Sequence, residues 1–424
     1  MKIFRIITAM LCVCFLLPAK GRAEQPGNSS AQIQMLQSQM QELTQIVREL
    51  KTTVDSQRRE IDSLKAVRDV QVPALQGSIS SSSPRFGTKI LPEIGAVADM
   101  ALKLDSPRSD TGGADRLSVR EVELILGGNV DPYSRFDSTI AFNEESTAEF
   151  EEAYLTRFEL PLDMTARIGR FKPRIGKVLA MHRDSLDTVD EPLVIQRYFG
   201  TEGMNKTGAD ITKLLDLPSP MVHQVTFGVL EGGNGEGGTV FGSTKRRPTL
   251  YGRLKNFIDI SDETNLEIGF SDALGSRDED QRFEVNVLGI DSTLIHHLSP
   301  TQDLKFQGEI FNVNRKESFV VDDATGRFNS IDGNVWGGYG LIDFRISSQW
   351  AAGFRLDDVE IVDRPVASPN HADLGYTGYL TFYQSEFARW RLQFTHLDLT
   401  NGSADNQVWL QGTFGVGEHK HKLQ

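Results

Sequence analysis

Cysteine is almost absent from this chain of 424 residues: only Cys12 and Cys14 occur, both near the N-terminus. The rest of the chain therefore has neither a disulfide framework nor a thiolate metal site. No apolar run reaches the roughly 18 residues of a transmembrane helix, which excludes a helical membrane protein. The formal charge of −13 argues against nucleic acid as a partner, because phosphate contacts need a basic surface. A membrane β-barrel remains compatible with these absences, since its strands hide their apolar faces by alternation.

Residues 1–23 have the pattern of a secretory signal peptide. Lys2 and Arg5 precede an apolar stretch over 6–17, and small residues surround Arg22 at the expected cleavage site. The apolar stretch is too short to span a bilayer as a helix. No small residue precedes either cysteine, so a lipoprotein cleavage site is not expected. The sequence therefore predicts an exported protein whose mature chain contains no cysteine.

The segment 31–69 carries a heptad repeat that predicts an α-helical coiled coil. Every seam position but one is apolar, and charged residues fill the outer positions from Glu42 to Lys65. A coiled coil needs partner strands, so we expect a homo-oligomer and favour a homotrimer. The alternative is a single amphipathic helix lying on a neighbouring surface, although so narrow a seam covers little apolar area. The seam residues are Ile33, Leu36, Met40, Leu43, Val47, Leu50, Val54, Gln57, Ile61 and Leu64.

After a Ser-rich linker over 70–93, the apolar period changes to two and predicts β-strands from 94 to 416. Over 388–397, for example, apolar residues such as Trp390 and Leu392 alternate with arginine, glutamine and threonine. Apolar groups on one face and polar groups on the other suit a wall between lipid and water. Sixteen such segments begin near residues 94, 117, 133, 150, 164, 208, 221, 248, 264, 283, 304, 335, 349, 371, 388 and 406.

The connectors between these segments alternate in length, which is typical of a barrel with short periplasmic turns and long external loops. We therefore predict an all-β transmembrane antiparallel barrel of about 16 strands, preceded by the coiled coil and followed by a C-terminal extension over 417–424. A soluble β-sandwich or propeller is the alternative, but no repeat of about forty residues is present. The short connectors are 129–132, 159–163, 216–220, 259–263, 296–303, 347–349 and 383–387, and the long ones include 105–115, 173–207, 232–248, 314–334 and 360–370.

Several short motifs lie in the first third of the predicted barrel. They are Arg120-Glu121-Val122-Glu123-Leu124, Asp131-Pro132-Tyr133, Glu152-Ala153-Tyr154-Leu155, Gly169-Arg170-Phe171-Lys172, Gly176-Lys177, His182, Asp190-Glu191-Pro192-Leu193-Val194 and Phe199-Gly200-Thr201-Glu202-Gly203. With them the chain resembles bacterial outer-membrane porins related to the phosphate-selective porins O and P, and more closely porin-like proteins labelled zinc-regulated outer-membrane receptors. The resemblance is firmest over 94–216 and returns at 414–421. It implies a porin-like barrel in which the long connector 173–207 folds into the lumen as a constriction loop.

Basic residues gather around the start of this connector, and on a pore wall they would attract anions. They are Arg167, Arg170, Lys172, Arg174, Lys177 and Arg183. Acidic residues follow from Asp184 to Glu191, and Glu121 and Glu123 fall on the inferred lumenal face. We therefore expect a constriction of mixed charge rather than strict anion selectivity. In the alternative, these opposite charges pair and hold the loop against the wall.

Metal and enzyme hypotheses have little support in the sequence. Of the eight histidines, His419 and His421 are the candidates for metal ligation, slightly favoured by the zinc-regulated label, but a pair without an obvious third ligand is usually a solvated turn. We therefore assign no metal site and expect no cofactor. Glycine runs such as 232–235 lack the strand-then-helix context of a phosphate loop, so we expect no enzyme.

The sequence taken together predicts an outer-membrane porin for passive diffusion of small hydrophilic solutes or ions, with its coiled coil in the periplasm. Its expected partners are outer-membrane lipid, other copies of the chain and the solutes themselves. The alternative is a structural or adhesive outer-membrane protein, tethered through the coiled coil and with a closed lumen. An energy-coupled metal receptor would need a plug domain of over a hundred residues, and the heptads and linker occupy the space before the first strand.

Overall fold

The computed structural model describes residues 92–106, 116–143, 148–277, 284–322, 327–362 and 368–417, with the backbone alone for 317–322 and 327–332. The predicted signal peptide and coiled coil lie outside the described residues. So do the predicted linker, apart from Pro92 and Glu93, and the C-terminal extension, apart from Gly417.

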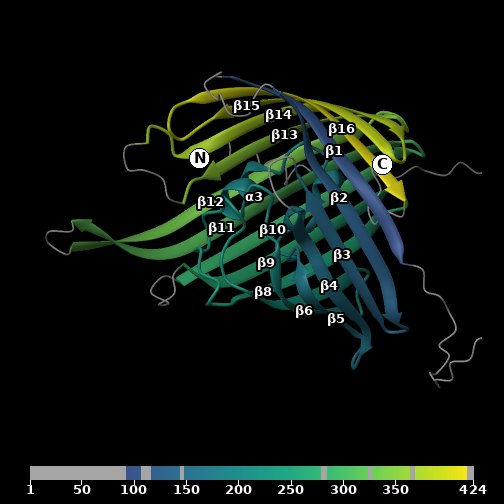
Figure 1. Cartoon of the computed structure of the whole chain (residues 1–424), viewed down its shortest axis with the longest axis horizontal. Helices are drawn as coiled ribbons and strands as arrows, with labels where there is room; N and C mark the ends of the chain where they lie inside the picture. Colours follow the sequence, from purple (N-terminus) through teal and green to yellow (C-terminus); the bar gives the residue numbers. More distant parts are fainter. Residues whose placement is uncertain are drawn as a thin grey trace, which may run out of the picture. The chain divides into compact units, whose positions relative to one another are not determined.

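Sixteen antiparallel strands form a closed barrel in which each strand pairs with its neighbours in the chain (Figure 1). The last strand closes on the first, with a register that runs from Gly95 opposite Gly417 to Ser106 opposite Asn406. The expected all-β antiparallel barrel of 16 strands is therefore confirmed. The strands are β1 (Glu93–Ser106), β2 (Arg116–Asp131), β3 (Ser134–Phe142), β4 (Glu149–Leu160), β5 (Met164–Phe171), β6 (Lys206–Leu215), β7 (Val222–Leu230), β8 (Thr249–Ser261), β9 (Thr264–Ser276), β10 (Glu284–Ser299), β11 (Gln302–Asp322), β12 (Arg327–Arg345), β13 (Trp350–Glu360), β14 (Ala372–Ser385), β15 (Ala388–Asp398) and β16 (Ala404–Gly417).

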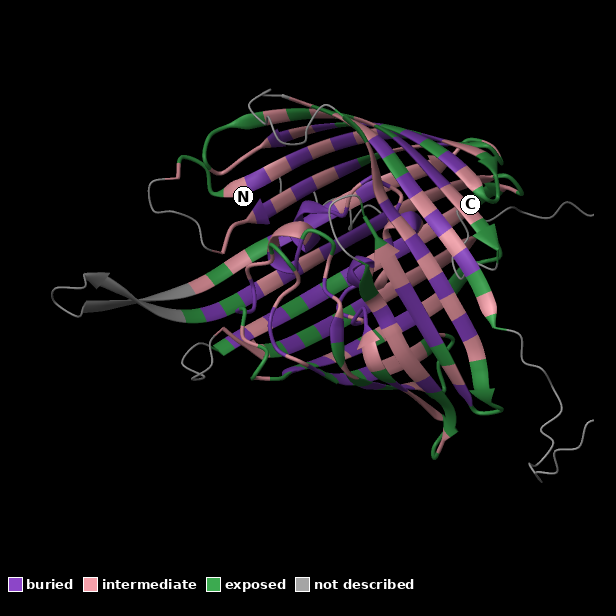
Figure 2. Ribbon diagram, in the orientation of Figure 1, coloured by how far each residue is buried: buried purple, intermediate pink, exposed green. Residues whose placement is uncertain are grey.

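The alternation in sequence becomes an alternation between the two faces of the wall (Figure 2). On β15, Leu392 and Phe394 are about half exposed on the outside, whereas Arg391 and Gln393 are buried on the inside. Successive side chains of a strand point to opposite faces, so the outer rows are apolar and the inner rows are largely polar. Exceptions such as Val287 on β10 and Phe311 on β11 are buried inside the barrel. Apolar side chains form the outer surface that a lipid-facing wall requires.

The strand starts agree with the sequence prediction to within two residues, except at β12. There the predicted connector 314–334 is wrong over most of its length, because β11 and β12 continue as a paired hairpin beyond Asn314 and Asn334 to Val320 and Phe328. The polar residues of this stretch resemble a loop in composition. Backbone pairing between two neighbouring strands can nevertheless continue past the point where alternation fades.

The short turns lie at the end of the barrel where β1 begins and β16 ends, as predicted for an even number of strands. Glu93 at the start of β1 pairs with Gly127 near the turn between β2 and β3. The connector between β5 and β6, 172–205, belongs to the opposite end and is called the inner loop below. It contains two short 3-10 helices, η1 (Val178–Ala180) and η2 (Arg183–Ser185), and the α-helix α3 (Leu193–Tyr198). Among the described residues, no helix has both the length and the apolar character needed to cross a membrane.

Candidate functional site

The inner loop runs through the interior of the barrel. Its backbone bonds to inward side chains on strands that lie far apart around the wall: Gly176 N donates to Ser271 on β9 at 2.9 Å, and Val189 N donates to Gln393 on β15 at 2.8 Å. A segment that reaches both of these strands from inside must cross the space that the barrel encloses. Figure 1 shows α3 within the ring of strands.

Buried polar groups of the wall hold the two ends of this crossing. Near the start, Glu309 on β11 accepts from Lys177 N at 2.7 Å and from Val178 N at 2.8 Å. Near the end, Asp357 on β13 accepts from Leu193 N at 2.9 Å. Pro192, the N-cap of α3, makes no side-chain cap, so Asp357 supplies the acceptor and negative charge that a helix N-terminus favours.

Two arginines of the wall hold the middle of the inner loop through its carbonyl groups. Arg391 on β15 donates to Leu186 O at 2.9 Å and to Thr188 O at 2.8 Å. Arg355 on β13 donates to Thr188 Oγ1 at 2.6 Å and to Asp190 O at 2.9 Å. Both guanidinium groups are about 1% exposed, so this part of the loop is fixed by buried, charge-assisted hydrogen bonds.

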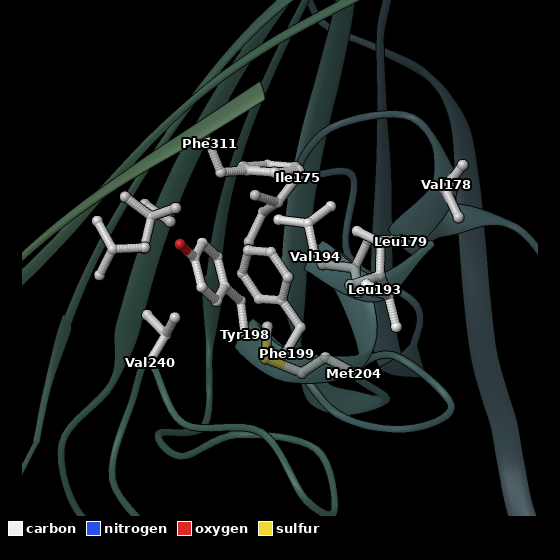
Figure 3. Packing of buried hydrophobic residues seen from close by; sticks show 14 of the residues in the cluster. Ile175, Val178, Leu179, Leu193, Val194, Tyr198, Phe199, Met204, Val240 and Phe311 are labelled. Atoms are coloured by element: carbon white, nitrogen blue, oxygen red, sulfur yellow. The ribbon is translucent and has the colours of Figure 1, made fainter. Parts of the chain in front are cut away.

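Apolar packing fixes the other side of the inner loop (Figure 3). Val194, Tyr198 and Phe199 are fully buried against the wall, and the Phe199 ring meets the Phe311 ring edge to face at 5.3 Å. A Cβ on Gly337 of β12 would lie 2.9 Å from both Tyr198 Oη and Val194 Cγ2, so only glycine leaves room for α3 there. The barrel therefore has a hydrophobic core inside it, on the side where α3 packs.

A second connector, 231–248 between β7 and β8, covers this core. Val240 and Phe241 are buried in the same cluster, Val240 N donates to Tyr198 O at 3.1 Å, and Gly235 N donates to Phe199 O at 2.8 Å. The glycines of this segment belong to a long connector of the kind predicted to form external loops, but they lie against the inner loop. Gly235 shows why glycine is needed, because a Cβ there would collide with the carbonyl oxygen of Gly203.

The structure separates the six predicted basic residues. Arg170 follows the register of Ile168, which is 63% exposed on the outer face, and it pairs with Glu231 at 3.6 Å. Arg167 is buried against Asp210 on β6. Arg170 therefore does not meet the others in the interior. Arg167 faces the interior near Arg174, and its charge is already neutralised by Asp210.

The other four basic residues belong to the inner loop, and each bonds to an acidic or hydroxyl group. Three of them join the loop to the barrel wall through ion pairs, which matches the alternative in which opposite charges hold the loop in place. The pairs are Lys172 Nζ with Glu151 Oε1 at 2.9 Å, Lys177 Nζ with Glu267 Oε1 at 3.3 Å and Arg183 with Glu121 at 3.2 Å, and Arg174 donates to Thr212 Oγ1 at 2.6 Å. Partial exposure of Lys177 and Arg183 leaves mixed charge on the interior surface.

Glu121 and Glu123 are buried and face the inner loop, where they contact Arg183 and His182. A β-bulge between β1 and β2 sets Asp99 opposite Glu121 but Met100 opposite Val119, and the extra residue, Arg120, donates to Asp99 Oδ2 at 2.9 Å inside the barrel. Bulges redirect side chains in this way. Arg120 and Glu121, which are consecutive on β2, consequently both point into the barrel.

A second bulge brings two more carboxylates inward, and sequence reasoning missed them as site residues. Thr139 pairs with Glu152 whereas Ile140 pairs with Phe150, so Glu151 is the extra residue. His182 of the inner loop lies between the resulting carboxylates and Glu123. Its Nε2 is 3.1 Å from Glu152 Oε2, and its Nδ1 is 3.4 Å from Glu151 Oε2 and 3.7 Å from Glu123 Oε1. Two features of the sequence could have pointed to this site. They are the consecutive glutamates Glu151 and Glu152, and His182, which only the family resemblance singled out.

The electrostatics of the inner loop follow from these partners. Burial alone would lower the pKa of His182, but hydrogen bonding to the three surrounding glutamates raises it well above 6.5. Burial alone would raise the pKa of Asp187, but the Lys305 ammonium, 2.5 Å away, holds it below its usual value of 3.8. Both charged forms are therefore stabilised by groups on the barrel wall.

Solved structures with this architecture are bacterial outer-membrane porins and channels. The outer-membrane channel DcaP of Acinetobacter baumannii is 11% identical, with a TM-score of 0.50 over 80% of this chain and 100% of that chain. The anion-selective porin from Comamonas acidovorans is 9% identical, with a TM-score of 0.52 over 77% of this chain and 100% of that chain. OprB of Pseudomonas putida is 8% identical, with a TM-score of 0.50 over 77% of this chain and 94% of that chain. The chain therefore has a porin-like fold.

The sequence comparisons are less specific. No protein-family model matches the chain. An uncharacterized protein of Aquifex aeolicus (strain VF5) is 26% identical over 295 residues, which is 64% of this chain. The match spans 61% of the length of that curated relative, and its name assigns no activity.

Proposed function

We propose that the protein is an outer-membrane porin through which small hydrophilic solutes or ions diffuse passively. The observation that supports this best is a closed barrel of 16 strands, wide enough in such folds to carry water, with a connector that crosses its interior. In this proposal the inner loop is the constriction, and transport involves no covalent chemistry.

The charges of the interior favour a general pore of mixed selectivity. Lys255 on β8 and Glu267 on β9 pair at 2.7 Å and remain partly exposed inside the barrel. Near the inner loop, Glu202 is 61% exposed beside Arg183. Because acidic and basic groups alternate on this surface, we do not propose strict anion selectivity.

We further propose that the chain is related to the phosphate-selective porins O and P and to the zinc-regulated porin-like proteins. In this view the coiled coil over 31–69 lies in the periplasm and joins copies of the chain, favouring a homotrimer. Cross-linking of the full-length chain in membranes tests this part, and a species of single-chain mass alone would contradict it.

Planar-bilayer conductance tests the pore itself. The purified mature chain should give steady, ohmic current steps. The alternative is a structural or adhesive protein with a closed lumen, which the interior hydrophobic core favours because it fills one side of the barrel. A correctly folded chain that inserts and stays electrically silent would support this alternative and reject the pore.

A single introduced thiol tests whether solutes pass the inner loop. The predicted mature chain has no cysteine, so Glu202→Cys can be labelled alone with either a cationic or an anionic thiol reagent. The two labels should shift the reversal potential in a salt gradient in opposite directions. The matched control is Ser261→Cys at the exposed end of β8, where both labels should leave the potential unchanged. Equal behaviour of the two variants would place the inner loop away from the conducting path.

A further inference from the structure

We propose that Glu123, Glu151 and His182 bind one divalent transition-metal ion, with Zn²⁺ the best fit, between the inner loop and the barrel wall. One ligand comes from β2, one from the bulge of β4 and one from the inner loop. Each offers a ligand atom, and these atoms all lie within 4.8 Å of one another. The donor set of one imidazole nitrogen and two carboxylate oxygens is one that zinc sites use.

The spacing of these atoms is close to that of ligands around zinc. Bonds of about 2.0–2.2 Å in a tetrahedral arrangement place neighbouring ligand atoms roughly 3.3–3.6 Å apart. His182 Nδ1 lies 3.4 Å from Glu151 Oε2 and 3.7 Å from Glu123 Oε1. Small side-chain movements would therefore convert this arrangement into a coordination sphere with three protein ligands.

The surroundings of the imidazole also suit a ligand. A histidine that binds a metal through one ring nitrogen usually donates its other N–H to a carboxylate or carbonyl group, which fixes the tautomer. Here Glu152 Oε2 lies 3.1 Å from Nε2. Glu152 is held in turn, because its Oε1 accepts from Lys172 N at 3.0 Å. In the tautomer protonated on Nε2, the lone pair of Nδ1 points towards the other two glutamates.

The charge balance at this site favours a divalent cation. Three glutamates and Lys172 leave two negative charges at this site. A protonated His182 compensates one of them, and a divalent ion that displaces the imidazole proton would cancel both. Lys172 pairs with Glu151 Oε1 at 2.9 Å, whereas Glu151 Oε2 is buried and faces His182 Nδ1 at 3.4 Å. A buried carboxylate whose charge is not fully compensated destabilises the folded protein. A cation bound at Glu151 Oε2 would remove this destabilisation. Glu151 is 12% exposed in its side chain, which leaves an entry from the interior.

Equilibrium dialysis of the full-length protein in detergent against Zn²⁺ tests this proposal without depending on pore activity. We expect one ion per chain, and a loss of affinity of at least tenfold in His182→Gln and Glu123→Gln. Glu152→Gln, which changes only the partner of Nε2, should lose about 10–100-fold. The matched control is His223→Gln, because His223 bonds to Asn256, shares the outward register of Phe227 on β7 and lies outside the proposed site. It should bind as the unmodified chain does.

Co²⁺ gives a second readout that needs no variant. The Co²⁺-loaded chain should show the intense visible absorption of a four-coordinate ion, and Zn²⁺ should abolish it. Zinc binding that is unchanged in His182→Gln, the absence of binding by the unmodified chain, or only the weak spectrum of hydrated cobalt would each overturn the proposal.

Discussion

Removing Arg355 should release the middle of the inner loop while the barrel stays closed. This guanidinium is about 1% exposed, and it joins Asp357 on its own strand to Thr188 and the Asp190 carbonyl of the loop. Arg355→Met keeps an unbranched side chain but leaves the buried Asp357 carboxylate without its cation. Breaking one partner of a buried ion pair typically costs about 3–5 kcal/mol.

We expect this cost to appear as local opening, because the sixteen-strand hydrogen-bond network does not include the inner loop. A change of about 3–5 kcal/mol corresponds to roughly a hundredfold to a few thousandfold in the opening equilibrium. Amide hydrogen exchange measures it directly. The amide of Val189, which donates to Gln393, should exchange faster by that factor, whereas amides in β13 and β14 should be unchanged.

The matched control is Arg345→Met on β12, where the guanidinium lies over the Tyr383 ring, 4.8 Å from its centroid. Exchange in the inner loop should be normal in this variant. Arg355→Lys should give an intermediate effect, because lysine keeps the charge but loses the planar fork. If loop amides exchanged no faster in Arg355→Met than in the control, Arg355 would not anchor the loop and the assignment of its role would be wrong.

The remaining predictions concern pH and selectivity. Lys305 lowers the pKa of Asp187. The charged Asp187 therefore stabilises the loop above its unfolded pKa of about 3.9, and this stabilisation is lost as the pH falls through the folded pKa. The difference in pepsin cleavage of the loop between Asp187→Asn and the unmodified chain should therefore be present near pH 5 and shrink as the pH falls through the folded pKa; a constant difference would contradict this sign. In a salt gradient, Lys255→Glu should move the reversal potential towards cation preference more than Arg170→Glu, because Arg170 follows the outward register of β5. An equal or larger shift for Arg170→Glu would place that side chain in the conducting path.

The barrel could be predicted from the sequence because its signal is repeated and local. Alternation such as that around Trp390 follows from the geometry of one strand, and connector lengths supply the topology. Prediction was wrong at β12, where pairing with β11 extends the strand to Arg327 through residues of loop-like composition. That extension depends on pairing with the neighbouring strand, which cannot be read from the sequence of one segment.

The interior was less predictable because its contacts join distant parts of the chain. The position of the inner loop follows from its length and the family resemblance, but the bond from Leu193 N to Asp357 joins residues separated by 164 positions. The two bulges are harder still to predict from the sequence, because each shifts the alternation of inward and outward side chains by one residue. Strict alternation assigns Glu151 and Glu152 to opposite faces, whereas the bulge lets both approach His182.

The packing of α3 also limits how the proposed pore can be gated. Leu193, Val194, Ile195, Tyr198 and Phe199 are almost completely buried, and exposing one such side chain to water costs about 1.5–3 kcal/mol. Swinging the whole helix away from the wall would therefore cost on the order of ten kcal/mol, which thermal motion does not supply. The stretch from 182 to 190 is held mainly by polar bonds, which can exchange with water at lower cost. Any regulated change in the width of the lumen should consequently arise there, and equal exchange protection of the 182–190 and 193–199 amides would contradict this division.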